Sequence, residues 1–303
     1  MRMLTAVVVR VAAPLSARAE VPDVVPDDLE IKIDKDEEKK EEDMGWKYAA
    51  TLGATASLNS VRNVIGTVDG ETYNLGAQLK ATANYSSGQS DRENTLTADI
   101  TQTRTPALPV FIKSAAELRL SSTYLYRIED WWGPYAQGEF TTAMARGFDV
   151  RNDAVEIERI FRDGTRSGPL LKGEQETFKL TGPYEPITLS ESIGGFLNAS
   201  DTAKLKARFK LGVGGEQVLV RDGFIFTGED GTYDEGLTRL LYTQLQSSSQ
   251  LGAVLRGSFD GTLAENVTYS VNAKVFYAAV SDFEFPDGSE LEGSDLLSTE
   301  IDA

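Results

Sequence analysis

The stretch that decides the fold is WKYAATLGATASLN, residues 46–59. From Trp46 to Leu58 every second position carries an aromatic, leucine or alanine side chain, and most positions between them are polar. A period of two predicts a β-strand with two unlike faces. Strands of soluble sheets have about 5 or 6 residues, whereas strands that span a membrane have about 10. We therefore expect a membrane-spanning strand here.

The same alternation returns along the chain. Residues 72–86 repeat it with Tyr73 and Tyr85 near the two ends, and aromatic residues at strand ends are typical of the interfacial girdles of membrane barrels. Further alternating runs lie at 93–103, 110–126, 131–146, 202–214, 237–260 and 265–279. Residues 45–303 are therefore predicted to form an all-β, antiparallel transmembrane β-barrel with about ten strands. The alternative is a large soluble sandwich or an extended sheet.

Connection lengths give the expected direction of the strands, because membrane barrels have short periplasmic turns and longer outer loops. Short connections, expected in the periplasm, lie at 87–92, 127–130 and 199–201. Long connections, expected outside, lie at 60–71, 147–186, 215–236 and 281–295. We interpret residues 237–260 as one long strand that descends to a turn near Asp260-Gly261. The alternative is a break at Ser247-Ser248-Ser249, which would reverse the final strands.

The C-terminal end departs from the barrel pattern. Residues 296–303 begin a strand, but the chain stops at Glu300-Ile301-Asp302-Ala303 rather than on an amphipathic strand with a terminal aromatic residue. We therefore expect a C-terminally truncated barrel, with about twelve strands in a full-length form.

The N-terminal residues predict export. Residues 1–19 combine basic Arg2, a short apolar run and an Ala-Arg-Ala cleavage site, so we expect a signal peptide and a mature chain beginning at Glu20. Arg10 interrupts the apolar run, and the alternative is an ordinary buried N-terminal strand. Residues 20–44 are dense in mixed charge and contain two prolines, which predicts a flexible, acidic periplasmic leader.

Two missing residue types narrow the chemistry. The chain has no cysteine and no histidine, which excludes thiol nucleophiles, Ser-His triads and the usual ligands of zinc, copper and haem. We therefore expect no enzyme activity, no cofactor and no metal centre. The net charge of −17 at pH 7 also argues against a nucleic-acid partner.

The expected partners are those of an outer-membrane protein: membrane lipid, lipopolysaccharide and the barrel-assembly machinery. The acidic segments 226–236 and 283–295 offer oxygen ligands through which divalent cations would bridge the chain to anionic lipopolysaccharide. Neither segment has the spacing of an EF-hand loop, and plain solvated acid is the alternative interpretation.

A basic row gives the candidate site. Lys204, Lys206, Arg208 and Lys210 alternate with apolar residues, so they should face the interior if the apolar residues face lipid. The other inward-facing charges that we single out are Lys113, Glu117, Arg119 and Glu139. These side chains would either set the ion selectivity of an open pore or pair with one another to fill a closed one.

Three segments also resemble a known family. GWK followed by alternation from Trp46, FIKSAAELRLSSTYLYRIEDWWGPYAQ at 111–137 and PITLSESIGGFLN at 186–198 resemble an uncharacterised, porin-like family of Gram-negative outer-membrane β-barrel proteins. The resemblance implies a barrel fold and the cell outer membrane as location. It implies no activity and no functional residues.

The sequence leaves three functions open. The first is a barrel that forms a narrow pore or binds a small solute. The second is a closed barrel that acts as a structural or surface-interaction protein through its outer loops. A hydrolase inside the barrel is the third, with Glu117 and Glu139 as the best carboxylate pair.

Overall fold

The computed structural model describes residues 44–62, 69–106, 108, 111–202, 204–232, 237–264, 267–282 and 296–302, and these are all-β. Their dominant feature is a ten-stranded sheet in the order β1-β2-β3-β4-β5-β10-β11-β14-β15-β16. Its strands are β1 Gly45–Val61, β2 Gly70–Ser86, β3 Ser90–Arg104, β4 Ile112–Tyr126, β5 Trp132–Ala143, β10 Ile187–Asp201, β11 Leu205–Leu219, β14 Ser248–Ala264, β15 Val267–Ser281 and β16 Leu297–Asp302. The predicted signal peptide and residues 20–43 of the leader lie outside the described residues.

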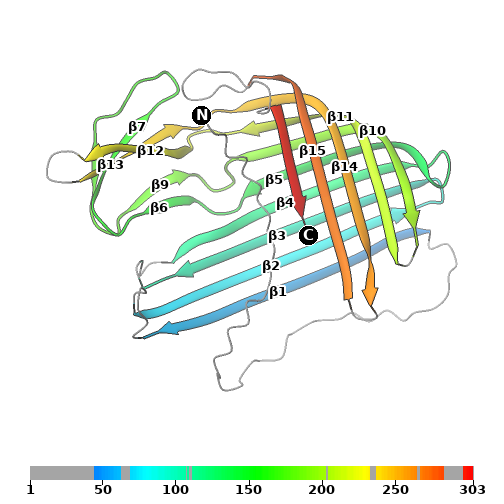
Figure 1. The fold of residues 1–303 in the computed structure, drawn as a ribbon, viewed down its shortest axis with the longest axis horizontal. Coiled ribbons are helices and arrows are strands. Elements are labelled where there is room, and N and C mark those ends of the chain that lie inside the picture. The colour runs from blue at the N-terminus through cyan, green and yellow to red at the C-terminus, as the bar shows by residue number, and fades with distance from the viewer. Residues whose placement is uncertain are drawn as a thin grey trace.

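Every neighbouring pair in this sheet is antiparallel. The connections at one end are short, as between β2 and β3 or β4 and β5, and the two longest described connections, after β5 and after β11, lie at the other end (Figure 1). The predicted long alternating strands are therefore confirmed. Within the described residues, no helix has the length and apolar character needed to cross a membrane.

The predicted single strand at 237–260 is wrong. The structure divides it into β13, Thr238–Gln244, and β14, which begins at Ser248 and continues past the expected turn at Asp260-Gly261 to Ala264. The expected consequence of a break is also wrong, because β13 belongs to a different sheet and the direction of β14 and β15 is unchanged. The alternation misled because it keeps the same phase on both sides of residues 245–247.

The two longest described connections fold into a small subdomain, which we call the cap. It contains β6 Gly147–Val150, β7 Val155–Ile160, β8 Leu170–Lys172, β9 Thr177–Thr181, β12 Phe224–Thr232 and β13. The first four strands come from the β5–β10 connection and the last two from the β11–β14 connection. The connections are joined by parallel pairing of β7 with β13, from Val155 opposite Thr238 to Ile160 opposite Thr243.

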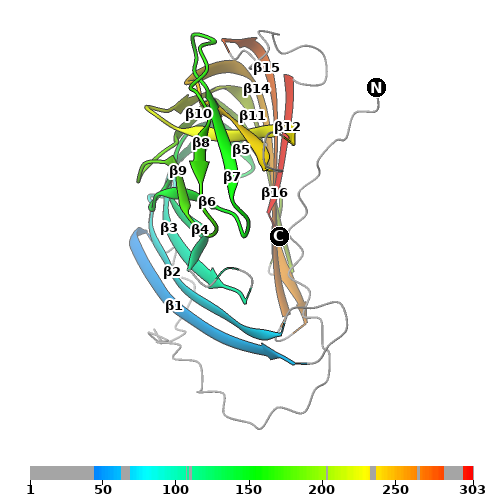
Figure 2. The ribbon, with the colours of Figure 1, turned by 90° about the vertical axis from the view of Figure 1, so that its left-hand side faces the viewer.

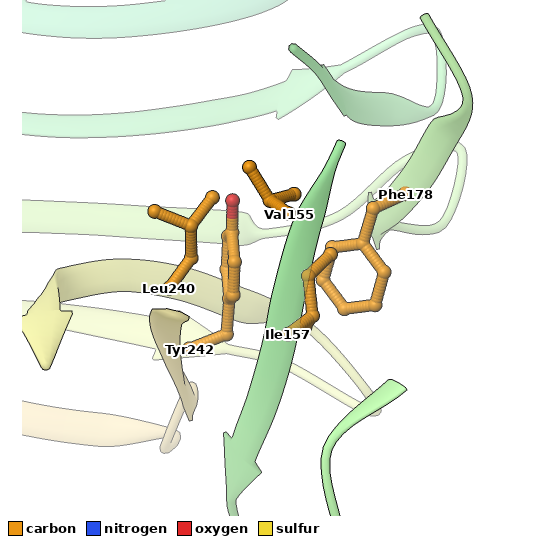
Figure 3. Close-up of a cluster of buried hydrophobic side chains, with 5 residues drawn as sticks. All are labelled: Val155, Ile157, Phe178, Leu240 and Tyr242. Atoms are coloured by element: carbon orange, nitrogen blue, oxygen red, sulfur yellow. The ribbon is translucent and has the colours of Figure 1, made fainter. Parts of the chain in front are cut away.

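The cap has its own hydrophobic core. Val155, Ile157, Phe178, Leu240 and Tyr242 form a buried cluster to which both connections contribute (Figure 3). The Tyr242 side chain is fully buried, and its ring centroid lies 4.8 Å from that of Phe178. Burial of a large aromatic side chain contributes about 1.5–3 kcal/mol, so this core gives two otherwise separate loops one fixed structure.

The expected closed barrel is not what the described residues form. The ten-stranded sheet curves strongly, with β1–β4 on one side and β14–β16 facing them (Figure 2). Among the described strands, however, β1 pairs only with β2 and β16 only with β15. Closure requires hydrogen bonds between the first and last strands. The described β16 has six residues, pairs with only part of β15, and makes no ladder with β1.

The two faces of the curved sheet differ in chemistry. Large apolar side chains point outward from the convex face, where Leu52, Ile193 and Leu211 are 70%, 62% and 65% exposed. Other exposed apolar side chains of this face are Trp46, Tyr48, Leu58, Leu75, Leu120, Tyr124, Leu197, Val213, Leu251, Leu255 and Tyr277. The concave face carries the charged and polar partners in the alternation.

Glycines allow β10 and β11 to approach one another closely on the concave face. Gly194 lies directly opposite Gly212. A Cβ atom added at Gly194 would lie 2.1 Å from the carbonyl oxygen of Leu211, and one at Gly212 would lie 2.1 Å from that of Ile193. Larger residues at this pair would push the strands apart.

Candidate functional site

The concave face gathers charged side chains from seven strands into one group, which we call the concave cluster. Its members alternate with the convex apolar residues on their strands, so the period of two places them on this face. Five are cations and five are carboxylates: Arg119, Arg208, Lys210, Arg256 and Lys274, with Glu93, Glu117, Glu139, Glu216 and Glu300.

Glu139 on β5 lies at the centre of the concave cluster. One of its carboxylate oxygens is 3.7 Å from Arg119 Nη1, and the other is 3.6 Å from Arg256 Nη1 on β14. Arg119 Nη2 also lies 3.4 Å from a carboxylate oxygen of Glu300 on β16. Since β4 and β16 are far apart in the strand order, the Arg119–Glu300 pair joins opposite sides of the curved sheet.

Two further ion pairs extend the cluster. Arg208 on β11 lies 2.7 Å from Glu93 on β3, a distance of a charge-assisted hydrogen bond, and its Nε donates to Asn198. Lys274 on β15 lies 3.1 Å from Glu216 on β11. Only the first of these two pairs spans several strands.

Lys210 is held differently from the other cations. Its Nζ donates to Oε1 of Gln137 at 3.2 Å and lies 5.7 Å from the centroid of the Tyr135 ring. Among the described residues, no carboxylate lies within ion-pair distance of this ammonium group. Lys210 therefore contributes a positive charge that the protein solvates with an amide and an aromatic face.

A cavity of about 240 Å³ opens within the concave cluster, and its charged lining comes from β4, β5, β11, β14, β15 and β16. Buried apolar side chains lie on the concave face on either side of it. Leu125, Tyr135 and Phe196 form a buried cluster toward the short connections. Val254, Phe276 and Ala278 form another toward the long connections. The polar cavity thus lies between two buried apolar clusters.

The predicted site residues have different outcomes. The structure brings Glu117, Arg119, Glu139, Arg208 and Lys210 together in the concave cluster. Lys204 and Lys206 lie near the short connections instead, where Lys206 is 67% exposed and 3.8 Å from Asp201. The basic row runs along the chain beyond the cavity, and the cavity reaches only the part of it that carries Arg208 and Lys210.

Lys113 also lies away from the cluster. A bulge in the β3–β4 ladder between Thr101 and Gln102 shifts the register there. The Lys113 ammonium donates to the backbone carbonyl of Ala145 at 2.9 Å, near the start of the cap. Its role in the described structure is to hold a connection in place.

The sequence analysis did not select Glu93, Glu216, Arg256 or Glu300. The alternating pattern places each on a polar strand face, so this signal was available. What it lacked was the pairing between distant strands, which depends on the curvature of the whole sheet. Within the described residues, no group of three or more aspartate or glutamate side chains is arranged to hold a metal ion.

Comparison with known proteins gives one match. The model of a family described as a protein of unknown function (DUF3078) matches residues 66–148, which include β2 to β5 and the start of the cap. Neither the curated proteins nor the solved structures contain a significant match to this chain. Over residues 66–148, the chain is therefore similar to a family whose function is not assigned.

Proposed function

We propose that this protein is an outer-membrane β-barrel that does not conduct ions and that presents the cap outside the membrane as a surface-interaction module. The observation that carries the proposal is the set of ion pairs that join distant strands across the concave face, Arg119 with Glu300 and Arg208 with Glu93. Charges that pair with one another fill an interior, whereas those of an open pore face water.

The convex face supports the membrane location. A soluble monomer rarely exposes a contiguous apolar surface larger than a few hundred Å². Here leucine, isoleucine and aromatic side chains are exposed along strands from β1 to β15. Lipid is the surrounding in which such a face is stable, and strands of 15 to 17 residues such as β1, β2 and β11 are long enough to cross it at a tilt.

Membrane insertion places one further condition on the sheet. Unpaired backbone groups are not tolerated against lipid, so the edges of β1 and β16 must both be paired in the membrane. The proposal therefore includes closure of the sheet between these edges by pairing beyond the ten described strands. In this proposal the cap lies on the outer side and the short turns lie in the periplasm, because membrane barrels have longer connections outside.

A narrow pore is the second candidate function, because the cavity lies on the concave face, which a closed barrel would enclose. Planar bilayers separate the two functions. The protein, refolded and inserted from detergent, should give no steady current above that of the empty bilayer, because in this proposal the paired charges and the two buried apolar clusters fill the interior of the closed barrel. A steady, anion-selective current would contradict the proposal. Fractionation of cells provides the accompanying test, since the outer-membrane fraction should contain a mature chain that begins at Glu20.

A further inference from the structure

Three cations stand side by side across three neighbouring strands. Lys210 on β11 lies directly opposite Arg256 on β14, and Arg256 lies directly opposite Lys274 on β15. Directly opposed residues have Cβ atoms about 4.5–5.5 Å apart, and like charges in such positions destabilise a sheet. A row of three is therefore a costly arrangement that needs negative charge close to it.

The protein supplies only part of this negative charge. Glu139 reaches Arg256 and Glu216 reaches Lys274. Lys210 contacts the amide of Gln137 and the ring of Tyr135, and the carboxylate of Glu93 acts on it from beyond ion-pair distance. The lining of the cavity has the same excess of positive over negative charge. It contains all five cations of the concave cluster and only two of its carboxylates, Glu139 and Glu300.

Hydrogen-bond donors are also left over at the same place. Arg256 lines the cavity, and its Nε atom is buried with no hydrogen-bond partner in the part of the chain that the structure describes. A buried N–H group without an acceptor is unfavourable, and native structures usually provide a partner for it. Lys210 has three N–H donors and uses one with Gln137. Excess positive charge and unused donors therefore occur together.

We propose that the cavity of the concave cluster binds a small oxyanion, a phosphate or a short carboxylate, with Lys210 and Arg256 as its principal ligands. Both anions present the oxygen acceptors that an ammonium and a guanidinium group bind through charge-assisted hydrogen bonds. The cavity of about 240 Å³ equals the liquid volume of about eight water molecules at ~30 Å³ each, which is sufficient for such an anion with several waters.

Lys210 has the determining role in this site. Arg119, Arg208, Arg256 and Lys274 each have a carboxylate partner in the structure. The bound anion would give Lys210 a negatively charged partner at hydrogen-bond distance, which no described carboxylate provides, and it would be an acceptor for the Arg256 Nε–H group. It would also reduce the repulsion along the row of three cations.

Isothermal titration of the whole chain, folded in detergent micelles, tests the site. Inorganic phosphate, succinate and acetate are titrated separately against a sodium chloride control of equal ionic strength. We expect saturable binding of at least one of the three oxyanions with a stoichiometry of one. Which of them binds distinguishes a phosphate site from a carboxylate site. No saturable binding of any of them would overturn the proposal.

Variants locate the binding in the cavity. Lys210→Gln should weaken binding at least tenfold, and Lys206→Gln, on the same strand but outside the cavity, should change the affinity less than twofold. Lys210→Met is the second variant if Lys210→Gln does not fold, because it keeps the apolar contact with Tyr135. Unchanged affinity in a folded Lys210 variant would contradict the site.

This inference stands apart from the proposed function. Titration in micelles requires the folded sheet but neither membrane insertion nor a closed interior. A barrel that conducts ions and binds phosphate would refute the closed barrel and support the site. One that conducts nothing and binds no oxyanion would refute the site alone.

Discussion

Glu139→Gln is the substitution that tests most directly whether ion pairs hold the two sides of the curved sheet together. The change keeps the size and shape of the side chain but removes the charge. Glu139 is the carboxylate that contacts both Arg119 and Arg256. After the substitution, Arg119 keeps Glu117 and Glu300, whereas Arg256 keeps no carboxylate partner among the described residues.

The expected loss follows from the exposure of these groups. The Glu139, Arg256 and Arg119 side chains are 15%, 17% and 32% exposed. Breaking a fully buried pair costs about 3–5 kcal/mol, and an exposed pair contributes about 0–1 kcal/mol. For a pair of intermediate exposure we expect Glu139→Gln to lower the free energy of unfolding by about 2 kcal/mol.

Urea unfolding in detergent micelles, followed by tryptophan fluorescence, measures this loss. Glu117→Gln is the matched control, because Glu117 also contacts Arg119 but its side chain is 51% exposed. We expect the control to cost less than about 1 kcal/mol, as an exposed pair does. Equal losses in the two variants would refute the reasoning, since the effect would then not depend on burial or on Arg256.

Three further predictions concern the convex face and the cap. Leu211→Arg should lower stability in lipid vesicles by about 2–4 kcal/mol if this residue faces the membrane midplane; unchanged folding yield in vesicles would contradict lipid contact. Tyr242→Phe removes the hydrogen bond that the hydroxyl donates to Asp149 and should destabilise the cap by about 1–3 kcal/mol, measured as faster limited proteolysis within the cap. Burial, together with Asp149, raises the pKa of Tyr242 above its usual 10.0. The stability that the protonated Tyr242 hydroxyl gives the cap should therefore be fully present below about pH 10 and be lost as the pH rises further, because Tyr242 ionises first in the unfolded cap. Tyr242→Phe should remove that pH dependence.

The strands of the large sheet could be predicted because each carries its own signal. In β1 and β2 the apolar and polar residues alternate for the whole length of the strand, and this local pattern survives in any sheet that has one apolar face. The same pattern put Arg208, Lys210 and Glu139 on the correct face. Which charges meet was not predictable, because the Arg208–Glu93 and Arg119–Glu300 pairs depend on how far the sheet curves.

The cap escaped prediction for a different reason. Its strands are short, and β8 and β9 have three and five residues, too few to show a period. Their structure comes from tertiary partners, most clearly in the parallel ladder of β7 and β13. β13 was hidden because its alternation continues into β14 without a change of phase. Period alone does not reveal that a chain leaves one sheet for another.

The parallel ladder of β7 and β13 also bears on the order in which the parts of the chain fold. Arg239 on β13 and Glu156 on β7 form an ion pair although they are 83 positions apart in the chain. Closing so long a loop costs entropy before any contact forms. Pairing of β5 with β10 and of β11 with β14 shortens the effective loop, because it brings the bases of both connections together. Because residues 155–160 pair with residues 238–244, we expect the cap to fold after the ten-stranded sheet has formed.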